Sequence, residues 1–145
     1  MFHFGHIQLL KKCEEVAFSL KQNSLGHPVR LLIGIYNDND CIKYKHKPIM
    51  TMNERAMSII ELFELLGMRD IFVGILIDAP IVETRDFYDS EDIVKVLHAR
   101  KEEEYIQTYY KEANEMGILR QLDYTEGIST SLLIERCIES MYEKI

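Results

Sequence analysis

The sequence predicts an α/β fold in which a parallel sheet carries helices on both faces. Its short apolar runs, at 30–36 and 70–77, are rich in β-branched residues, which suits strands covered on both sides. Amphipathic stretches separate these runs, and strands that alternate with helices form right-handed βαβ units. A length of 145 residues suits one domain, 1–145, with a core of its own.

The elements follow one another without an internal repeat. We expect, in order, a helix that begins near residue 6, a strand at 30–36, a turn at 37–40, a basic irregular stretch at 43–47, a helix up to residue 66, a strand at 70–77, a short helix at 84–89, a strand at 93–98, a polar helix at 102–116, a strand at 118–122 and a last helix to the C-terminus. Helices are predicted from apolar residues spaced three and four apart, and strands from β-branched runs.

Several helix ends carry cap signals. Thr51 or Asn53 can cap the helix that runs to residue 66, and Ser129 or Thr130 can cap the last one. Gly67 can end the former helix in the left-handed conformation. Gly117 would do the same for the polar helix.

Composition excludes several classes of protein. Seventeen Lys and Arg against 24 Asp and Glu leave a net charge of −7, which argues against broad electrostatic binding to nucleic acid or anionic membranes. Three cysteines (Cys13, Cys41 and Cys137) without a CxxC spacing indicate thiols in a reducing compartment. No apolar run is long enough for a membrane helix, and no secretory signal is visible. We expect a soluble, cytoplasmic domain.

Three polar clusters lie where predicted strands end or helices begin, the edge at which such sheets bind ligands. They are HFGH at 3–6, the lysine-rich stretch at 43–47 and TEGISTS at 125–131. Each has a plain structural explanation: a frayed tail or an adventitious metal pair, a solvated loop, and an ordinary helix cap. The order of strand, lysine loop and helix nevertheless places the second cluster at the same edge as the first.

The HFGH cluster has the chemistry of an anion site. His3 and His6 are three residues apart and share one helix face. Gly5 lets an anion approach the backbone, and a helix N-terminus offers N–H donors and partial positive charge. Such a site can hold a polyphosphate and stabilise charge during group transfer.

Taken together, these motifs resemble the choline-phosphate and ethanolamine-phosphate cytidylyltransferases of the HxGH nucleotidylyltransferase superfamily. The resemblance covers nearly the whole chain. The matching segments are HFGH and the helix after it, RLLIGIYND at 30–38, Lys45 with the segment that ends in MNER at 52–55, DAP at 78–80, His98 at a strand end, and TEGISTS at 125–131. The resemblance implies the Rossmann-like nucleotidylyltransferase fold.

The implied activity is cytidylyl transfer. The phosphate of phosphocholine would attack the α-phosphorus of CTP, releasing pyrophosphate and giving CDP-choline for phosphatidylcholine synthesis. Implied catalytic residues are His3, His6 and Lys45, with Lys47 as a stand-in for Lys45. Implied CTP contacts are Gly5, Arg55, His98, Thr125, Gly127, Ile128, Ser129 and Thr130. The phosphoalcohol would meet Lys45, Ile81 and Tyr105.

The resemblance also implies Mg²⁺ carried with CTP and a homodimer. From composition and motif spacing we expect no protein-held metal, no nucleic-acid partner and no membrane helix in this chain. The chain departs from the family most at its start, where Met1 and Phe2 directly precede the first histidine. Family members have a central strand at that place, so the first strand is missing and we expect its two neighbours to be unpaired. One hypothesis is that the natural chain starts upstream, which mass spectrometry of the native N-terminus would test.

Three further departures concern the ligand sites. Tyr124 stands where the family has Arg, Ala99 where it has Asp, and Ile81 where choline enzymes have Trp. Aromatic faces favour a quaternary ammonium, and the chain has no Trp. Phosphoethanolamine and glycerol-3-phosphate therefore stay open as acceptors, as do adenylyl transfer and a homologue that binds CTP without turnover.

Overall fold

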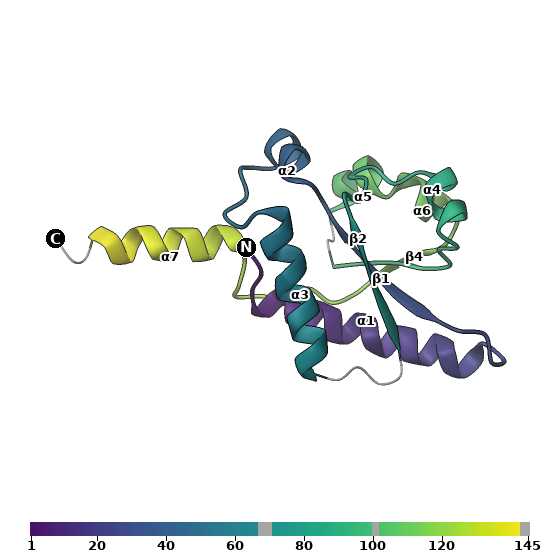
Figure 1. Ribbon diagram of the computed structural model, residues 1–145. Helices are drawn as coiled ribbons and strands as arrows, with labels where there is room; N and C mark the ends of the chain where they lie inside the picture. The colour runs from purple at the N-terminus through teal and green to yellow at the C-terminus, as the bar shows by residue number, and fades with distance from the viewer. Residues whose placement is uncertain (67–70, 100–101, 143–145) are drawn as a thin grey trace.

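The computed structural model describes residues 1–66, 71–99 and 102–142 and confirms the α/β class (Figure 1). Helices flank short parallel strands, as the alternating pattern of the sequence predicts. The elements are α1 (Phe4–Asn23), β1 (Arg30–Ile35), α2 (Asp38–Tyr44), α3 (Met52–Leu66), β2 (Phe72–Ile77), α4 (Arg85–Ser90), β3 (Val96–His98), α5 (Glu103–Tyr109), α6 (Lys111–Glu115), β4 (Leu119–Gln121) and α7 (Thr130–Tyr142).

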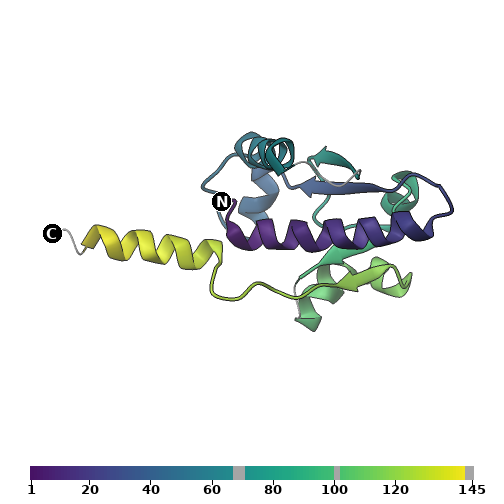
Figure 2. The ribbon, with the colours of Figure 1, turned by 90° about the horizontal axis from the view of Figure 1, so that it is seen from below.

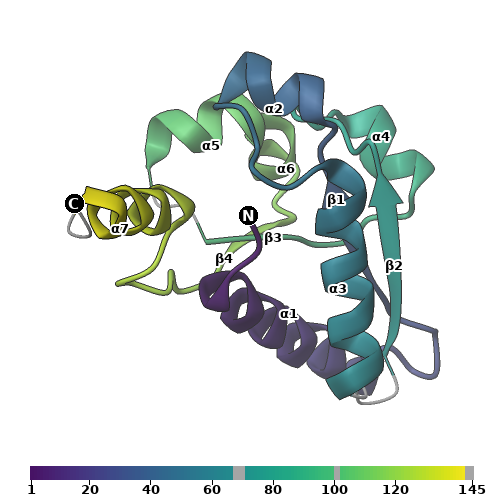
Figure 3. The same ribbon diagram turned by 60° about the vertical axis from the view of Figure 1, so that its left-hand side comes forward.

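The strands form two separate parallel pairs. β1 lies beside β2, with Arg30 opposite Phe72, and β3 lies beside β4, with Val96 opposite Leu119. Among the described residues, no strand joins one pair to the other. The two pairs are inclined to one another in Figure 3. The expected gap in the middle of the sheet is therefore confirmed for the described part of the chain.

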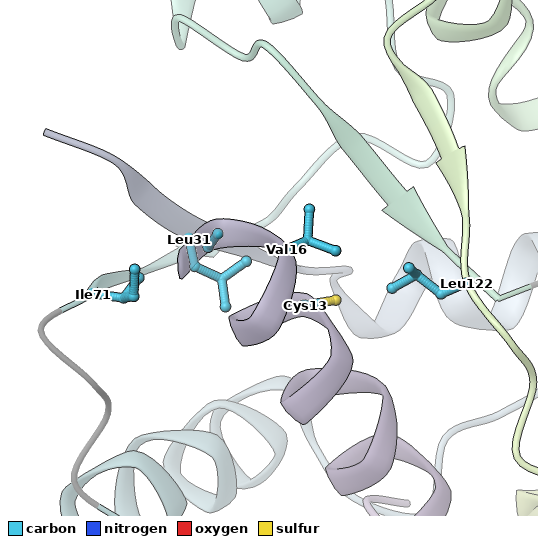
Figure 4. Packing of buried hydrophobic residues seen from close by; sticks show 6 residues of the cluster. Cys13, Val16, Leu31, Ile71 and Leu122 are labelled. Carbon is cyan, nitrogen blue, oxygen red and sulfur yellow. The ribbon is translucent and has the colours of Figure 1, made fainter. Parts of the chain in front are cut away.

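Helix α1 bridges the two pairs with its buried face. Figure 2 shows it running between them, and Figure 4 shows the packing. Cys13 and Val16 of α1 form one buried cluster with Leu31 of β1 and with Leu122, which follows β4. Each fully buried aliphatic side chain contributes about 1.5–3 kcal/mol relative to an exposed one. This helix thus packs against both strand pairs at once.

Two further apolar clusters complete the core. Ile35 of β1 packs with Ala56 and Ile59 of α3, which covers one face of the first strand pair. The other cluster lies around the second pair and consists of Tyr88, Val96 and Ala113. Each strand pair therefore has its own helical cover, and the start of α7 lies against the N-terminus of the chain.

Predicted helix caps are confirmed at two positions. Thr51 Oγ1 accepts a hydrogen bond from the Glu54 N–H at 3.3 Å, and the Glu54 carboxylate accepts the Thr51 N–H at 2.8 Å, which is a capping box. Ser129 Oγ accepts the Leu132 N–H at 3.1 Å. Gly117 has φ of +69°, as expected for a helix-ending glycine. The cap predicted at Gly67 lies outside the described residues.

The segment at 37–40 was predicted as a turn, and this prediction is wrong. Asn37 is instead the N-cap of α2, because its side-chain oxygen accepts the Asp40 N–H at 2.7 Å. The acidic residues that follow lie in the first helical turn, where the helix dipole favours negative charge. The basic stretch begins inside this helix and continues beyond it from Lys45.

The polar helix expected at 102–116 is divided at Tyr110, whose φ of −124° and ψ of +20° separate α5 from α6. The Tyr110 ring lies 5.0 Å from that of buried His98, so a tertiary contact accompanies the break. The strand expected at 93–98 is shorter, because the Ile93 N–H bonds to the carbonyl of Tyr88 rather than to a strand.

Helix α7 projects away from the rest of the molecule (Figures 1 and 2). None of its described residues is buried, and Met141 and Tyr142 are largely exposed. In the part of the chain that the structure describes, every helix is too short or too polar to cross a membrane.

Candidate functional site

The two histidines of HFGH cap the first helix with their own rings. His3 is the N-cap residue, and its Nδ1 accepts a hydrogen bond from the Gly5 N–H at 3.2 Å. Nδ1 of His6 accepts the His3 N–H at 3.3 Å, and the two ring centroids lie 4.0 Å apart. Because both Nδ1 atoms accept, the proton of each neutral ring is on Nε2. The sequence suggested open N–H donors here, but the Gly5 N–H is occupied by His3.

Both rings are neutral near pH 7. Burial lowers the pKa of His6 to about 4, helped by the nearby charges of His3, the α-amino group and Lys45. Burial and the α-amino group also lower the pKa of His3. Each Nε2–H is therefore a neutral donor. The positive groups that repel a proton from His6 would attract an anion instead.

Lys45 begins the loop after α2 and lies against Tyr36. It is the C-cap residue of that helix, and its backbone N–H bonds to the carbonyl of Cys41 at 3.0 Å. Its Nζ lies 5.0 Å from the centroid of the Tyr36 ring. Its charge is among those that lower the pKa of His6. Because Tyr36 and His6 border one cavity, the Tyr36 ring lies between Lys45 and the first cluster, while Lys47 is exposed further along the loop.

TEGISTS reaches the same end of α1. A Cβ atom on Gly5 would lie 3.2 Å from Cγ2 of Ile128 and 3.1 Å from Cε1 of His3, so only glycine fits without a shift. The hydroxyl of Thr130 donates to the carbonyl of Met1 at 3.4 Å. The positive φ of Gly127, +77°, turns the chain into this contact. The first and third clusters are therefore neighbours, as expected for motifs at the ligand-binding edge of one sheet.

Thr125 and Ser129 lie on the same segment and are half-buried. Ser129 uses its hydroxyl as the cap of α7. Ser129 therefore has the structural role of a helix cap, as the sequence analysis also allowed.

Arg55, an implied CTP contact, also ties the site together. Its guanidinium donates to the Tyr36 carbonyl at 2.8 Å and pairs with Asp38 Oδ1 at 2.6 Å. This hydrogen bond holds the pKa of Asp38 below its usual range. The Arg55 side chain also borders a cavity of about 250 Å³ whose wall is mostly aliphatic and includes His6 and Gly34. Its position is set by protein contacts before any ligand arrives.

His98 lies on the second strand pair and is 4% exposed. Neither of its ring nitrogens has a hydrogen-bond partner, and burial lowers its pKa. Buried polar atoms normally have partners, so this neutral ring is a candidate to contact a ligand. Ile81 is 5% exposed and belongs to the interior, whereas Tyr105 is half-buried with its ring 6.0 Å from that of Tyr110.

A group of tyrosines around Glu83 was not predicted from the sequence. Tyr88 donates its hydroxyl to Glu83 Oε2 at 2.8 Å, and burial raises the pKa of that carboxyl. Tyr36 and Tyr110 share a hydrogen bond between their hydroxyl groups, and burial raises the pKa of both. One local signal existed, because Tyr36 directly follows β1, at the carboxyl end of a parallel strand.

The parallel strands and the histidine–lysine cluster define an α/β protein with a site suited to phosphate groups. No family model matches the chain. It aligns with ethanolamine-phosphate cytidylyltransferase from Dictyostelium discoideum (28% identity over 97% of the chain), choline-phosphate cytidylyltransferase 2 from Arabidopsis thaliana (31% over 96%) and ethanolamine-phosphate cytidylyltransferase from Mus musculus (26% over 99%).

These matches confirm the family resemblance: the chain is related to the choline-phosphate and ethanolamine-phosphate cytidylyltransferases, which are nucleotidyltransferases. The alignments cover 36%, 42% and 33% of those proteins, so the chain spans about a third to two fifths of their length.

Proposed function

We propose that the chain transfers a cytidylyl group from CTP to the phosphate of a phosphoalcohol. The observation that carries the proposal is the meeting of the His3 and His6 rings with Ile128 of TEGISTS at the start of α1, where the positive charge of Lys45 also acts on His6. The related cytidylyltransferases support the choice of nucleotide.

In this reaction the substrate phosphate is itself the nucleophile. One of its oxygens forms a bond to the α-phosphorus of CTP, and the bond from that phosphorus to the bridging oxygen of the β-phosphate breaks. Pyrophosphate leaves with the electron pair. No side chain has to form a covalent intermediate, so catalysis consists of positioning and charge stabilisation.

The proposed roles follow from the chemistry of each group. The Nε2–H groups of His3 and His6 donate to the triphosphate, and the Lys45 ammonium lies between the two substrates. Thr125, Gly127 and Ser129 line the approach to α7, where nucleotide groups would bind. The unpartnered nitrogens of His98 suit a polar group of the nucleotide.

We propose phosphocholine as the acceptor. The rings of Tyr105 and Tyr110 lie with their centroids 6.0 Å apart, next to Tyr36 and Lys45, and aromatic faces attract quaternary ammonium groups. These rings could replace the tryptophan that is absent near Ile81. Phosphoethanolamine is the second candidate, because the Glu83 carboxyl lies among the same rings and could accept its N–H groups.

We propose that Mg²⁺ arrives with the triphosphate. Within residues 1–66, 71–99 and 102–142, no three His, Cys, Asp or Glu side chains gather into a metal-binding group. Mg²⁺ commonly keeps several waters and binds through substrate phosphates, so these residues fit an ion bound chiefly to CTP. When bound, the ion neutralises phosphate charge. Chelation should remove turnover, and added Mg²⁺ should restore it.

The test is pyrophosphate release with CTP and Mg²⁺, comparing phosphocholine, phosphoethanolamine and glycerol-3-phosphate, with ATP as the competing nucleotide. Release that requires CTP and phosphocholine is expected. A preference for another acceptor would change the substrate and keep the reaction, and a preference for ATP would indicate adenylyl transfer. Binding of CTP to folded protein without release under any condition would contradict the enzyme and favour a nucleotide-binding homologue.

We also propose a homodimer, on the resemblance alone, and a cytoplasmic location, on the cysteine pattern. Light scattering during size-exclusion chromatography measures the mass directly, and 17.1 kDa would be the monomer value. Imaging of the tagged protein in its source cell tests the compartment.

A further inference from the structure

The ring of Tyr36 lies between Lys45 and the rest of the site. The Lys45 ammonium lies 5.0 Å from the ring centroid, within the range of a cation–π contact. Tyr36 and His6 border the same cavity of about 250 Å³, and the charge of Lys45 is among those that lower the pKa of His6. One aromatic side chain thus links the loop lysine to the end of α1.

Tyr36 is held at both of its ends. Its backbone carbonyl accepts the Arg55 guanidinium at 2.8 Å, directly after β1. Its hydroxyl shares a hydrogen bond with Tyr110, at the junction of α5 and α6. The residue is half-buried, so its ring has a fixed backbone, a fixed tip and limited space to turn.

Lys45, in contrast, is exposed and follows the last turn of a short helix. A lysine side chain in such a position has several rotamers, and holding it in one of them costs entropy. Contact with a fixed ring favours the rotamers in which Nζ lies over that ring.

Resting on the cytidylyl transfer proposed above, we infer that Tyr36 is a positioning residue that holds the Lys45 ammonium beside His6 before the phosphates bind. It acts through Lys45 and takes no part in proton or phosphoryl transfer. An exposed cation–π contact changes such a population roughly two- to fivefold, which is the effect expected on kcat.

The kinetic test compares Tyr36→Leu with Tyr36→Phe. Loss of the ring should lower kcat roughly two- to fivefold, and Tyr36→Phe should restore most of it because the ring remains. The matched control is Tyr44→Leu, since Lys43 lies over the Tyr44 ring at 4.8 Å outside the proposed site, and it should leave kcat unchanged. Circular dichroism verifies folding, and Tyr36→Met replaces Tyr36→Leu if the latter does not fold.

A double-mutant cycle with Lys45→Ala separates positioning from other roles. The Tyr36→Leu effect should disappear when Lys45 is already alanine. An equal loss in both backgrounds would overturn the inference. A rise in the phosphoalcohol KM with unchanged kcat would also overturn it, because the ring would then contact the substrate head group.

A second readout needs no activity. Lysines carrying ¹³C-labelled dimethyl groups give separate NMR signals, and Lys45→Arg identifies the signal of Lys45. Tyr36→Leu should move that signal by removing the ring current, whereas Tyr36→Phe should not. Tyr44→Leu should move only the Lys43 signal. A Lys45 signal that does not move in Tyr36→Leu would refute the contact. An inactive wild-type protein that shows the expected shifts would contradict only the proposed function.

Discussion

Gly5→Ala should damage the activity of this protein far more than its stability. The added Cβ would meet Cε1 of His3 at 3.1 Å and Cγ2 of Ile128 at 3.2 Å, distances tighter than ordinary van der Waals contact. His3 and Ile128 must therefore move apart by a few tenths of an ångström. In the proposed mechanism both neighbours contact CTP, so the substitution disturbs two halves of one site at once.

The energetic effect on folding is small because two contributions oppose one another. Alanine is favoured over glycine in a helix by up to about 1 kcal/mol, and the close contacts cost a similar amount. We expect the free energy of unfolding to change by less than about 1 kcal/mol. Misplaced catalytic groups are far more costly, since an error of about 1 Å can reduce a rate about 10²-fold. A shift of a few tenths of an ångström should reduce kcat/KM roughly tenfold.

The assay pairs urea denaturation with pyrophosphate release. The matched control is Gly26→Ala at the other end of α1, where φ is +90° and nothing lies within 4 Å of the added Cβ. That variant should lose about 1 kcal/mol of stability through backbone strain and keep its turnover. Unchanged kcat/KM in folded Gly5→Ala would refute the claim that the contact of HFGH with TEGISTS forms the site.

Three further predictions concern charge and capping. Lys45→Ala should lower turnover at least about 10²-fold in the pyrophosphate assay, and an unchanged rate would exclude it as the bridging lysine. Thr51→Ala should lower the free energy of unfolding in urea by about 1 kcal/mol, whereas Asn53→Ala, inside the helix, should change it by less than about 0.5 kcal/mol. The free energy of unfolding should fall as the pH drops from about 6.5 towards 4, because the unfolded chain binds a proton that folded His6 excludes. His6→Gln should weaken this pH dependence. The same pH dependence in urea denaturation of the variant and the wild type would contradict the prediction.

The local sequence was sufficient to predict those elements whose formation depends mainly on their own residues. β1 and β2 were predicted from β-branched runs, and Thr51 and Ser129 from the preference of hydroxyl side chains for helix caps. The prediction of a turn at Asn37 was wrong because asparagine favours both turns and helix N-caps. Only its hydrogen bond with the Asp40 N–H shows that it is an N-cap here.

Tertiary contacts decide the elements that sequence could not place. The interruption at Tyr110 accompanies contacts with His98 and Tyr36, which are 12 and 74 positions away along the chain. The strand at 93–98 shortens because Tyr88 takes the Ile93 N–H. No window of neighbouring residues contains these partners.

The predictions for the site show the same difference between what the sequence indicates and what only tertiary contacts decide. Positions at strand ends and helix starts predicted that HFGH, the lysine loop and TEGISTS share one edge, and the closeness of Gly5 to Ile128 agrees for the first and third. The Tyr36 contact was missed, because it depends on which way an exposed lysine leaves the end of a short helix.

The net charge of −7 and a site for a polyphosphate are compatible because charges act locally. At physiological ionic strength, exposed charges are screened beyond about 8 Å. Burial is the main cause of the low pKa of His6, and nearby positive charge, including that of Lys45, adds to it. A group that resists protonation because of adjacent positive charge is, by the same Coulomb energy, a favourable place for an anion. The acidic surface governs which large partners approach, and these few positive groups govern which small ligand binds.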